Sequence, residues 1–195
     1  KLLMLFVEKN PYESAVLYVC FYVLAVSFSI PVATALTFLA GFLFGYKIGL
    51  VLAIMSACLG SSILFFVISL GLKVKLTESI YKHPLFNDAK YGINRNLYGY
   101  LLFIRLFPII PFWLANLVPP ILGIKFFPFI VTTFLGILPG TLIIAFTGSQ
   151  FGIAIGDVED PEHYLNNELS IFFLFVFLAI LSLSRVFAKF FGLMK

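Results

Sequence analysis

The sequence predicts an all-α integral membrane protein that forms a single domain. Hydrophobic residues make up 62% of the 195-residue chain and charged residues only 11%, whereas about 25% of residues are charged in soluble domains. The mean hydropathy is +1.08. The apolar runs are continuous, whereas a membrane β-barrel needs alternating segments of about ten residues. These observations exclude a water-soluble fold and a β-barrel.

Apolar segments and polar loops divide the chain into successive elements. Pro31 is expected to open the first hairpin, and Gly41 and Gly45 to close it. In chain order we expect a span at 14–30, a short re-entrant hairpin at 31–45, a span at 46–72, a polar loop at 73–96, a re-entrant hairpin at 97–123, a span at 126–148, an acidic loop at 150–168 and a last span at 169–187.

Loop charge predicts the orientation. Lysines and arginines outnumber carboxylates in the loop at 73–96, whereas the loop at 150–168 has carboxylates and no lysine or arginine. The positive-inside rule places the first loop and the basic C-terminus in the cytoplasm, and the second loop outside. The net charge of +4 therefore reflects topology, and no nucleic-acid partner is expected.

The number of crossings requires a re-entrant segment. Two apolar segments, 97–123 and 126–148, separate loops on opposite faces, so one of them must leave by the face it entered. We assign the hairpin to the first, because Arg105 is costly in hydrocarbon and Pro108 and Pro111 interrupt a helix. Irregular backbone at this depth is tolerated where protein or a water-filled cavity satisfies it.

The two predicted hairpins share short elements in the same order. Pro31 precedes a Gly-x-Lys element that starts at Gly45, and Pro111 precedes one that starts at Gly123; a Leu-Gly pair follows each. Because the loop charges give the two units opposite orientations, the pattern indicates an inverted repeat, with a chance match as the alternative. Inverted repeats of a broken helix and a span are a transporter architecture.

Arg105 and Asn116 are the candidate residues of a substrate path. Arg105 is the one charged residue between Arg95 and Lys125, and a guanidinium suits bidentate contact with a phosphate. The alternative is that it snorkels to the cytoplasmic surface from the mouth of the hairpin. For Asn116 the alternative to a ligand contact is an interhelical hydrogen bond.

Further candidates shape the backbone. Prolines end helices and glycines permit turns, while loop turning and helix packing are the alternatives to a functional role. The hairpin-shaping candidates are Pro31, Gly41, Gly45, Pro108, Pro111, Gly123, Gly136, Pro139 and Gly140. The sequence has no catalytic motif and no metal-ligand spacing, so we expect no enzyme, no cofactor and no metal.

Two stretches resemble the sequence blocks of the DedA / VTT-domain superfamily, also called SNARE-associated Golgi proteins: GFLFGYKIGLVLAIMSACLGSSILFFVISLG and LLFIRLFPIIPFWLANLVPPILGIKFFPFIVTTFLGILPGT. The resemblance covers about 28–150 and is strongest to the bacterial branch related to the yeast Tvp38 protein. It implies two re-entrant hairpins that face each other. It also implies that Arg105 is the family's hairpin arginine, with Pro108, Pro111 and Gly140 as structural partners.

The resemblance further implies lipid handling. Eukaryotic relatives scramble phospholipids, and some bacterial relatives are implicated in recycling undecaprenyl phosphate or in proton-dependent homeostasis. Members proposed to be proton-coupled have membrane carboxylates around the first hairpin, whereas this chain has no Asp or Glu from Ser14 to Thr77. That departure disfavours proton coupling.

We therefore expect scramblase- or flippase-like transport of a phospholipid or polyprenyl phosphate across the bacterial inner membrane, with membrane lipids as partners. The alternatives are an ion- or proton-coupled small-solute transporter and a structural or trafficking protein without transport. The loop at 73–96 is either a surface-lying helix or an ordinary linker. One domain spans 1–195, with 14–30 and 169–187 as flanking spans, and a homo-oligomer is left open.

Overall fold

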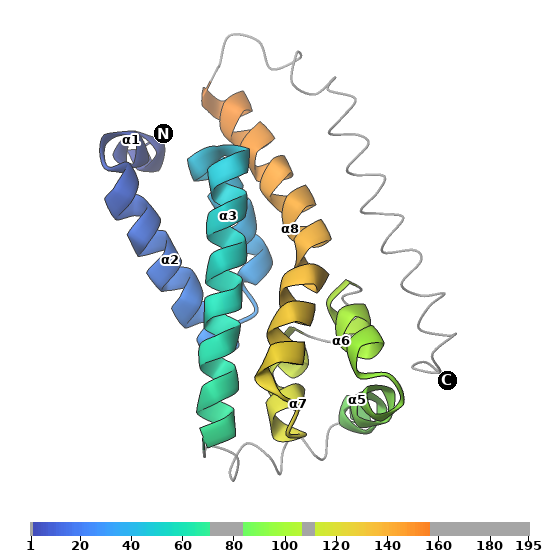
Figure 1. Ribbon diagram of the computed structural model, residues 1–195. Helices are drawn as coiled ribbons and strands as arrows, with labels where there is room; N and C mark the ends of the chain where they lie inside the picture. The colour runs from blue at the N-terminus through green and yellow to red at the C-terminus, as the bar shows by residue number, and fades with distance from the viewer. Residues whose placement is uncertain (1, 71–83, 107–111, 157–195) are drawn as a thin grey trace.

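The computed structural model describes residues 2–70, 84–106 and 112–156, and these residues form helices joined by short turns, with no strand among them. The all-α prediction is confirmed, and the span predicted at 169–187 lies outside the described residues. The helices are α1 (Leu2–Lys9), α2 (Pro11–Ser27), α3 (Ala33–Leu70), α5 (Pro84–Arg95), α6 (Leu97–Leu106), α7 (Phe112–Ile121) and α8 (Phe126–Gly156) (Figure 1).

α3 consists of two limbs, residues 33–44 and 46–70, that meet at Gly45. Gly45 has φ 73° and ψ 170°, a conformation that glycine adopts without a Cβ clash. The chain reverses here, because a Cβ on Gly49 would overlap the carbonyl of Ala40, although these residues lie about 14 Å apart along a straight helix. The hairpin predicted within 31–45 is therefore wrong, since its residues form one helical limb and the reversal follows that limb.

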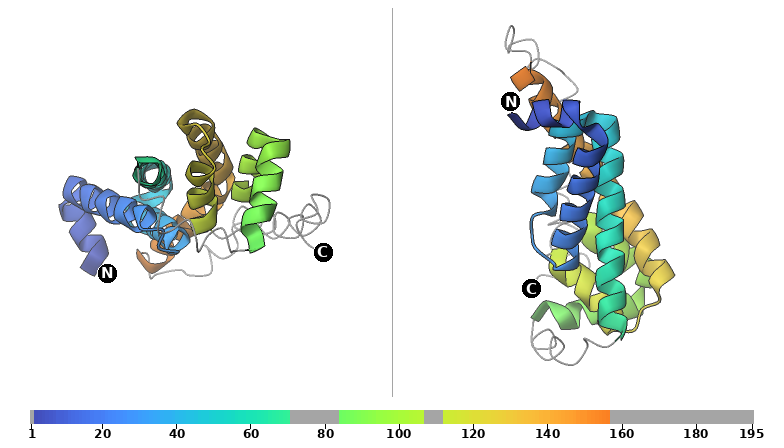
Figure 2. Two further views of the ribbon diagram at one scale, coloured as in Figure 1. Left: turned by 90° about the horizontal axis from the view of Figure 1, so that it is seen from below. Right: turned by 90° about the vertical axis from the view of Figure 1, so that its left-hand side faces the viewer.

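α2 and the first limb of α3 form the hairpin instead. Ser27, at the end of α2, donates a hydrogen bond from Oγ to the carbonyl of Gly60 at 3.3 Å. Gly60 precedes the end of α3 by about ten residues, or about 15 Å of helix. The turn at 28–32 therefore lies beside the middle of the second limb, well short of the lower end in Figure 1 and in the right-hand view of Figure 2.

Two tyrosine hydroxyls tie α2 to the first limb. Tyr18 donates a hydrogen bond to the carbonyl of Leu36 at 3.0 Å. The hydroxyl of Tyr22 lies 3.1 Å from Oγ1 of Thr37. Both rings are buried, so the contact between α2 and the first limb combines apolar packing with satisfied polar groups.

The second half of the described chain begins at the lower end, where α5 lies across the bundle (Figure 1). α6 rises from α5, and α7 returns to the lower end, where α8 starts. Gly123 ends α7 with φ 74°, and the N–H of Ile124 donates to the carbonyl of Pro119 at 3.0 Å, as in a helix C-cap. The segment 97–123 thus contains two short helices, while 107–111 lies outside the described residues.

α3 and α8 pack with their backbones in close contact. A Cβ on Gly41 would overlap the carbonyl of Ala145, and one on Gly148 would overlap that of Phe38. Gly41 is therefore a packing position between the first limb and α8, and the prediction that it closes a turn is wrong. Such close approach through small residues is typical of membrane helices.

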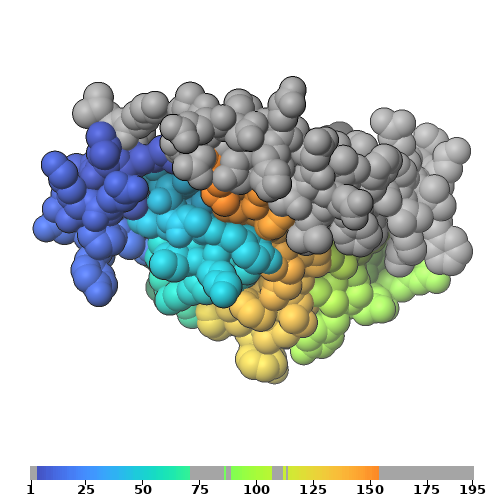
Figure 3. Space-filling view, turned by 90° about the horizontal axis from the view of Figure 1, so that it is seen from above, coloured from blue at the N-terminus to red at the C-terminus, as the bar shows by residue number. Residues whose placement is uncertain are grey.

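By length and composition, α3 and α8 are candidates to cross a bilayer; in α3 the limb long enough to do so is the second, residues 46–70. α8 continues to Gly156, past the end predicted at 148, and contains Pro139 within the helix. Apolar side chains such as Leu17 of α2 and Met55 and Leu59 of α3 are exposed, as expected of surfaces that contact lipid tails. Seen from above, α1, α3 and the end of α8 lie side by side at the upper end (Figure 3).

Candidate functional site

Arg105 lies in the last turn of α6, against α8. A Cβ on Gly136 of α8 would come within 2.6 Å of the Arg105 Cβ, so glycine at this position lets the two helices approach. Gly136 follows the start of α8 by about ten residues, or about 15 Å, which is half of a hydrocarbon core about 30 Å thick. The dipole of α6 favours a cation in its last turn.

Two neighbours hold the guanidinium of Arg105. Nη1 donates a hydrogen bond to the carbonyl of Leu101, one turn earlier in α6, at 3.2 Å. The guanidinium carbon lies 5.0 Å from the centroid of the Phe129 ring of α8, which is a cation–π distance. The side chain thus lies back along α6 toward the lower end and stays between α6 and α8.

Nη2 of Arg105 is buried and has no hydrogen-bond partner in the part of the chain that the structure describes. The sequence has no Asp or Glu from Ser14 to Thr77 or from Ala89 to Gly156, so α3, α6, α7 and α8 have no carboxylate to balance the charge. An unpaired buried cation is costly. A ligand with an anionic oxygen would supply both the missing acceptor and the opposite charge.

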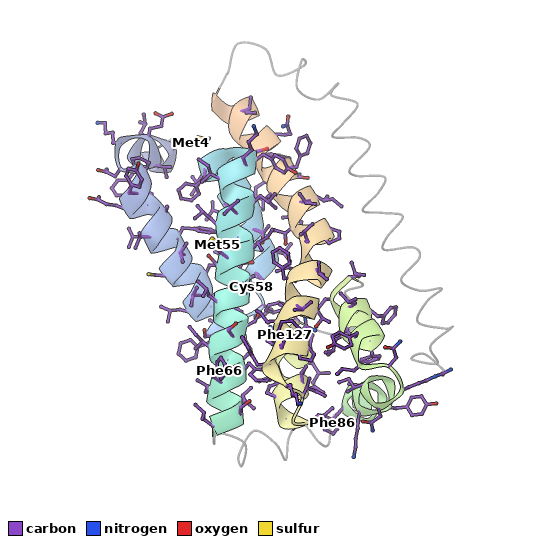
Figure 4. The ribbon with its side chains drawn as sticks, in the orientation of Figure 1. Met4, Met55, Cys58, Phe66, Phe86 and Phe127 are labelled. Atoms are coloured by element: carbon purple, nitrogen blue, oxygen red, sulfur yellow. The ribbon has the colours of Figure 1, made fainter. Side chains whose placement is uncertain are left out.

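The second limb of α3 contacts α8 next to Arg105, at Phe129. The Phe65 ring lies 4.8 Å from the Phe129 ring, and Cys58 is an electrostatic neighbour of Arg105. Cys58 lies near mid-height of α3 (Figure 4). Ser61 is between these residues at helical spacing, and is therefore on the same face of α3. Its side chain is 0% exposed, and its Oγ has no partner among the described residues.

Asn116 lies on α7, which packs against α3. Its side chain is 1% exposed, and Nδ2 has no hydrogen-bond partner among the residues described. The residues on either side of it belong to a buried cluster that includes Ile104, the residue before Arg105. The two predicted path residues therefore lie in the same part of the molecule, and no hydrogen bond between them is present in the described regions.

The predicted hairpin-shaping residues have different surroundings. Pro31 is in the turn after α2, where the N–H of Val32 donates to the carbonyl of Ile30 at 2.8 Å. A Cβ on Gly140 would meet nothing within 4 Å, so Gly140 is not a packing position among the described residues. Pro108 and Pro111 lie outside those residues.

The described residues contain no group of three or more His, Cys, Asp or Glu side chains that could hold a metal ion. The site instead contains the guanidinium of Arg105 and neutral polar side chains, surrounded by aromatic and aliphatic residues. Such an arrangement can bind an anion, and α3, α6, α7 and α8 contribute no carboxylate to it.

Sequence reasoning missed Phe129 and Ser61. An aromatic residue near the start of an apolar span gives no signal of which face it occupies. Ser61 is visible as one of two adjacent serines in an apolar run, but the sequence does not indicate which serine faces the interior. Both assignments depend on how α3 and α8 are rotated about their axes.

The chain is similar to known proteins over the region that contains this site. Residues 30–150 match the VTT domain family. The chain is 35% identical over 138 residues to the transmembrane protein 41 homolog of Dictyostelium discoideum, over 70% of this chain and 40% of that protein. It is 31% identical over 129 residues to the homolog of the same name in Caenorhabditis elegans, over 66% of this chain and 52% of that protein.

Human transmembrane protein 41B is 27% identical over 135 residues, which cover 69% of this chain and 46% of the human protein. The chain thus spans about half the length of the curated relatives it matches. No solved structure matches the chain.

Proposed function

Because the chain belongs to the VTT-domain family of membrane proteins, we propose that it moves lipids with a phosphate headgroup between the two leaflets of a membrane. The observation that carries the proposal is the buried Nη2 of Arg105, which has no partner among the described residues. The surrounding helices contain no carboxylate. A headgroup phosphate would complete the site, because guanidinium and phosphate make short, charge-assisted hydrogen bonds.

The path for the lipid is formed by two re-entrant hairpins that enter from opposite faces. α2 with the first limb of α3 is the upper hairpin, and α6 with α7 is the lower one. Three observations support this reading: the turn after α2 lies beside Gly60, Arg105 lies beside Gly136, and the positive-φ turns at Gly45 and Gly123 lie at opposite ends. Half-length helices that meet near the midplane are typical of inverted-repeat transporters.

The hairpins replace part of the hydrocarbon barrier with protein. A headgroup that leaves either leaflet would meet Arg105 part-way, and the lipid tails would stay in the bilayer beside the exposed apolar faces. Transport of this kind needs no energy source. By the positive-inside rule the lower end, where α5 carries Lys90 and Arg95, faces the cytoplasm of a bacterial inner membrane.

The test is a lipid translocation assay in liposomes. The protein is reconstituted with a fluorescent phospholipid, and dithionite quenches the label in the outer leaflet. We expect the wild type to raise the fraction quenched above that of empty vesicles, and Arg105→Ala to slow translocation at least tenfold at equal protein content. Arg105→Lys keeps the charge but loses the bidentate geometry, so we expect an intermediate rate.

Two outcomes would overturn parts of the proposal. A wild type no faster than empty vesicles contradicts lipid translocation. A normal rate for Arg105→Ala, with the wild type active, contradicts the role of the arginine and leaves the transport intact.

A further inference from the structure

We propose that Ser61 is a second ligand for the phosphate, so that α3 and α6 share one oxyanion site. This inference rests on the proposed function and adds to it a residue from outside the two hairpins. It assigns the bound group to the class of phosphate monoesters and diesters, whose oxygens accept several hydrogen bonds at once.

Ser61 differs from Ser56 and Ser62, the two nearest serines of its helix. Ser56 donates a hydrogen bond to the carbonyl of Leu52 at 2.7 Å, and Ser62 donates one to the carbonyl of Cys58 at 2.7 Å. Bonds of this kind are the usual way in which a helix satisfies a hydroxyl in an apolar environment. Ser61 is completely buried, yet its Oγ makes no such bond and has no other partner among the described residues.

The neighbours of Ser61 place it at the level of the guanidinium. Cys58, three residues earlier on the same face, is an electrostatic neighbour of Arg105. Phe65, four residues later, contacts the Phe129 ring that the guanidinium covers. Ser61 therefore lies one turn before the ring that shares Phe129 with Arg105.

Both groups are hydrogen-bond donors that lack an acceptor in the described residues. Nη2 and Oγ are not bonded to each other, since each has no partner there. An oxyanion between them would accept a hydrogen bond from each. One bond from α6 and one from α3 would fix the position of the oxyanion in two directions. Two unsatisfied buried donors cost free energy, and an oxyanion that accepted from both would recover it.

The decisive comparison uses adjacent serines. Ser61→Ala removes the free hydroxyl, whereas Ser62→Ala removes a hydroxyl that is satisfied within its own helix and serves as the matched control. In the liposome assay we expect Ser61→Ala to slow phospholipid translocation about tenfold, because one hydrogen bond to a charged group corresponds to about a tenfold change in rate. Ser62→Ala should stay within about twofold of the wild type.

Thermal unfolding in detergent separates a binding role from a structural one. Removing an unsatisfied buried hydroxyl should leave the midpoint of Ser61→Ala unchanged or higher. A midpoint that falls in proportion to the lost rate would overturn the inference, because it would show that Ser61 supports the fold. The double variant Arg105→Ala, Ser61→Ala should be no slower than Arg105→Ala alone if both residues bind the same phosphate.

The outcomes distinguish the two proposals. If Ser61→Ala keeps the wild-type rate while Arg105→Ala is slow, the inference fails and the proposed function stands. If the wild type does not move lipid at all, both fail. Inorganic phosphate at millimolar concentration should not slow the wild type, because the site lies within the bilayer; inhibition would show that the ligand is free phosphate and would overturn the lipid assignment.

Discussion

Arg105 carries a free-energy cost that its neighbours only partly offset. An arginine at the centre of a membrane helix costs about 2.5–3.5 kcal/mol on insertion scales. A cation–π contact recovers about 0.5–2 kcal/mol, and the Phe129 ring supplies one. The bond from Nη1 to the Leu101 carbonyl satisfies one nitrogen, but Nη2 stays unsatisfied among the described residues. Arg105 therefore costs stability in the fold, and an anionic ligand would offset that cost.

The importance of Arg105 could be predicted from the sequence, because a lone charge in an apolar run is visible there. The residues that surround Arg105 could not be predicted from the sequence. Whether Ser61 or Ser62 is the buried serine without a helix bond depends on a rotation of α3 by one residue, and that rotation is set by packing against α8 and α7. Asn116 was predicted on the same path, and its burial is consistent with either a ligand contact or an interhelical bond.

Replacing Gly136 should separate α6 from α8. In Gly136→Ala the new Cβ would come within 2.6 Å of the Arg105 Cβ, and a Cβ cannot rotate away. We expect the free energy of unfolding to fall by about 1–3 kcal/mol, as in other overpacked sites, and lipid translocation to slow. Denaturant unfolding in mixed micelles measures the first quantity.

Gly140→Ala is the matched control on the same helix, one turn later. A Cβ there would meet nothing within 4 Å, and alanine favours helix over glycine by up to about 1 kcal/mol. Its stability should be unchanged or higher. Equal losses for the two variants would contradict the assigned contact between α6 and α8.

At the scale of elements, the sequence predicted breaks at Pro31 and Gly45 but paired the segments wrongly. α2 has 17 residues, or about 25 Å of helix, which is shorter than a hydrocarbon core of about 30 Å. Apolar composition alone cannot distinguish a limb of this length from a complete span. The bond from Ser27 to Gly60 shows where the limb ends, and this contact between distant segments is not encoded by local pattern.

α5 was predicted only as one of two alternatives for the loop at 73–96. The buried residues Phe86, Ala89 and Ile93 follow helical spacing, which is the signal of an amphipathic helix. Lys90 and Arg95 are exposed; by helical spacing Arg95 lies opposite the buried residues, and Lys90 lies at their edge. This signal was present in the sequence, whereas the docking of α5 below α6 depends on tertiary packing.

Removing one hydroxyl from the upper hairpin should loosen it. Tyr18→Phe loses the buried hydrogen bond to the Leu36 carbonyl, and we expect the free energy of unfolding to fall by about 1 kcal/mol. Tyr12→Phe is the control, because Tyr12 is 87% exposed and should change stability little. Unfolding measured by tryptophan fluorescence compares the two, and an identical effect would argue against the bracing role of Tyr18.

At the scale of the molecule, two turns with a glycine at positive φ lie at opposite ends of the bundle (Figure 1). Gly45 and Gly123 have φ of 73° and 74°, and each is followed two residues later by an exposed lysine, Lys47 and Lys125. Loop charge predicted opposite orientations for the two halves from the sequence. The pairing of α3 with α8 could not be predicted, because it depends on backbone contacts at glycines such as Gly41 and Gly148.

Cysteine labelling tests this arrangement. In a background with Cys20→Ala and Cys58→Ala, we expect Lys47→Cys to react with a membrane-impermeant maleimide from outside the cell. Lys125→Cys should react only after the membrane is permeabilised, because the proposed orientation places its turn on the cytoplasmic side. Reaction of both cysteines from the same side would contradict the inverted repeat.

We propose that this chain accelerates lipid translocation by recognising a phosphate at Arg105. The most direct measurement compares labelled phosphatidylglycerol with a labelled glucosyl lipid, which has no phosphate, in liposomes that contain wild type or Arg105→Ala. We expect the wild type to accelerate the phospholipid at least tenfold more than the glucosyl lipid, and Arg105→Ala to remove this difference. Equal acceleration of both lipids by the wild type would show that the phosphate is not recognised.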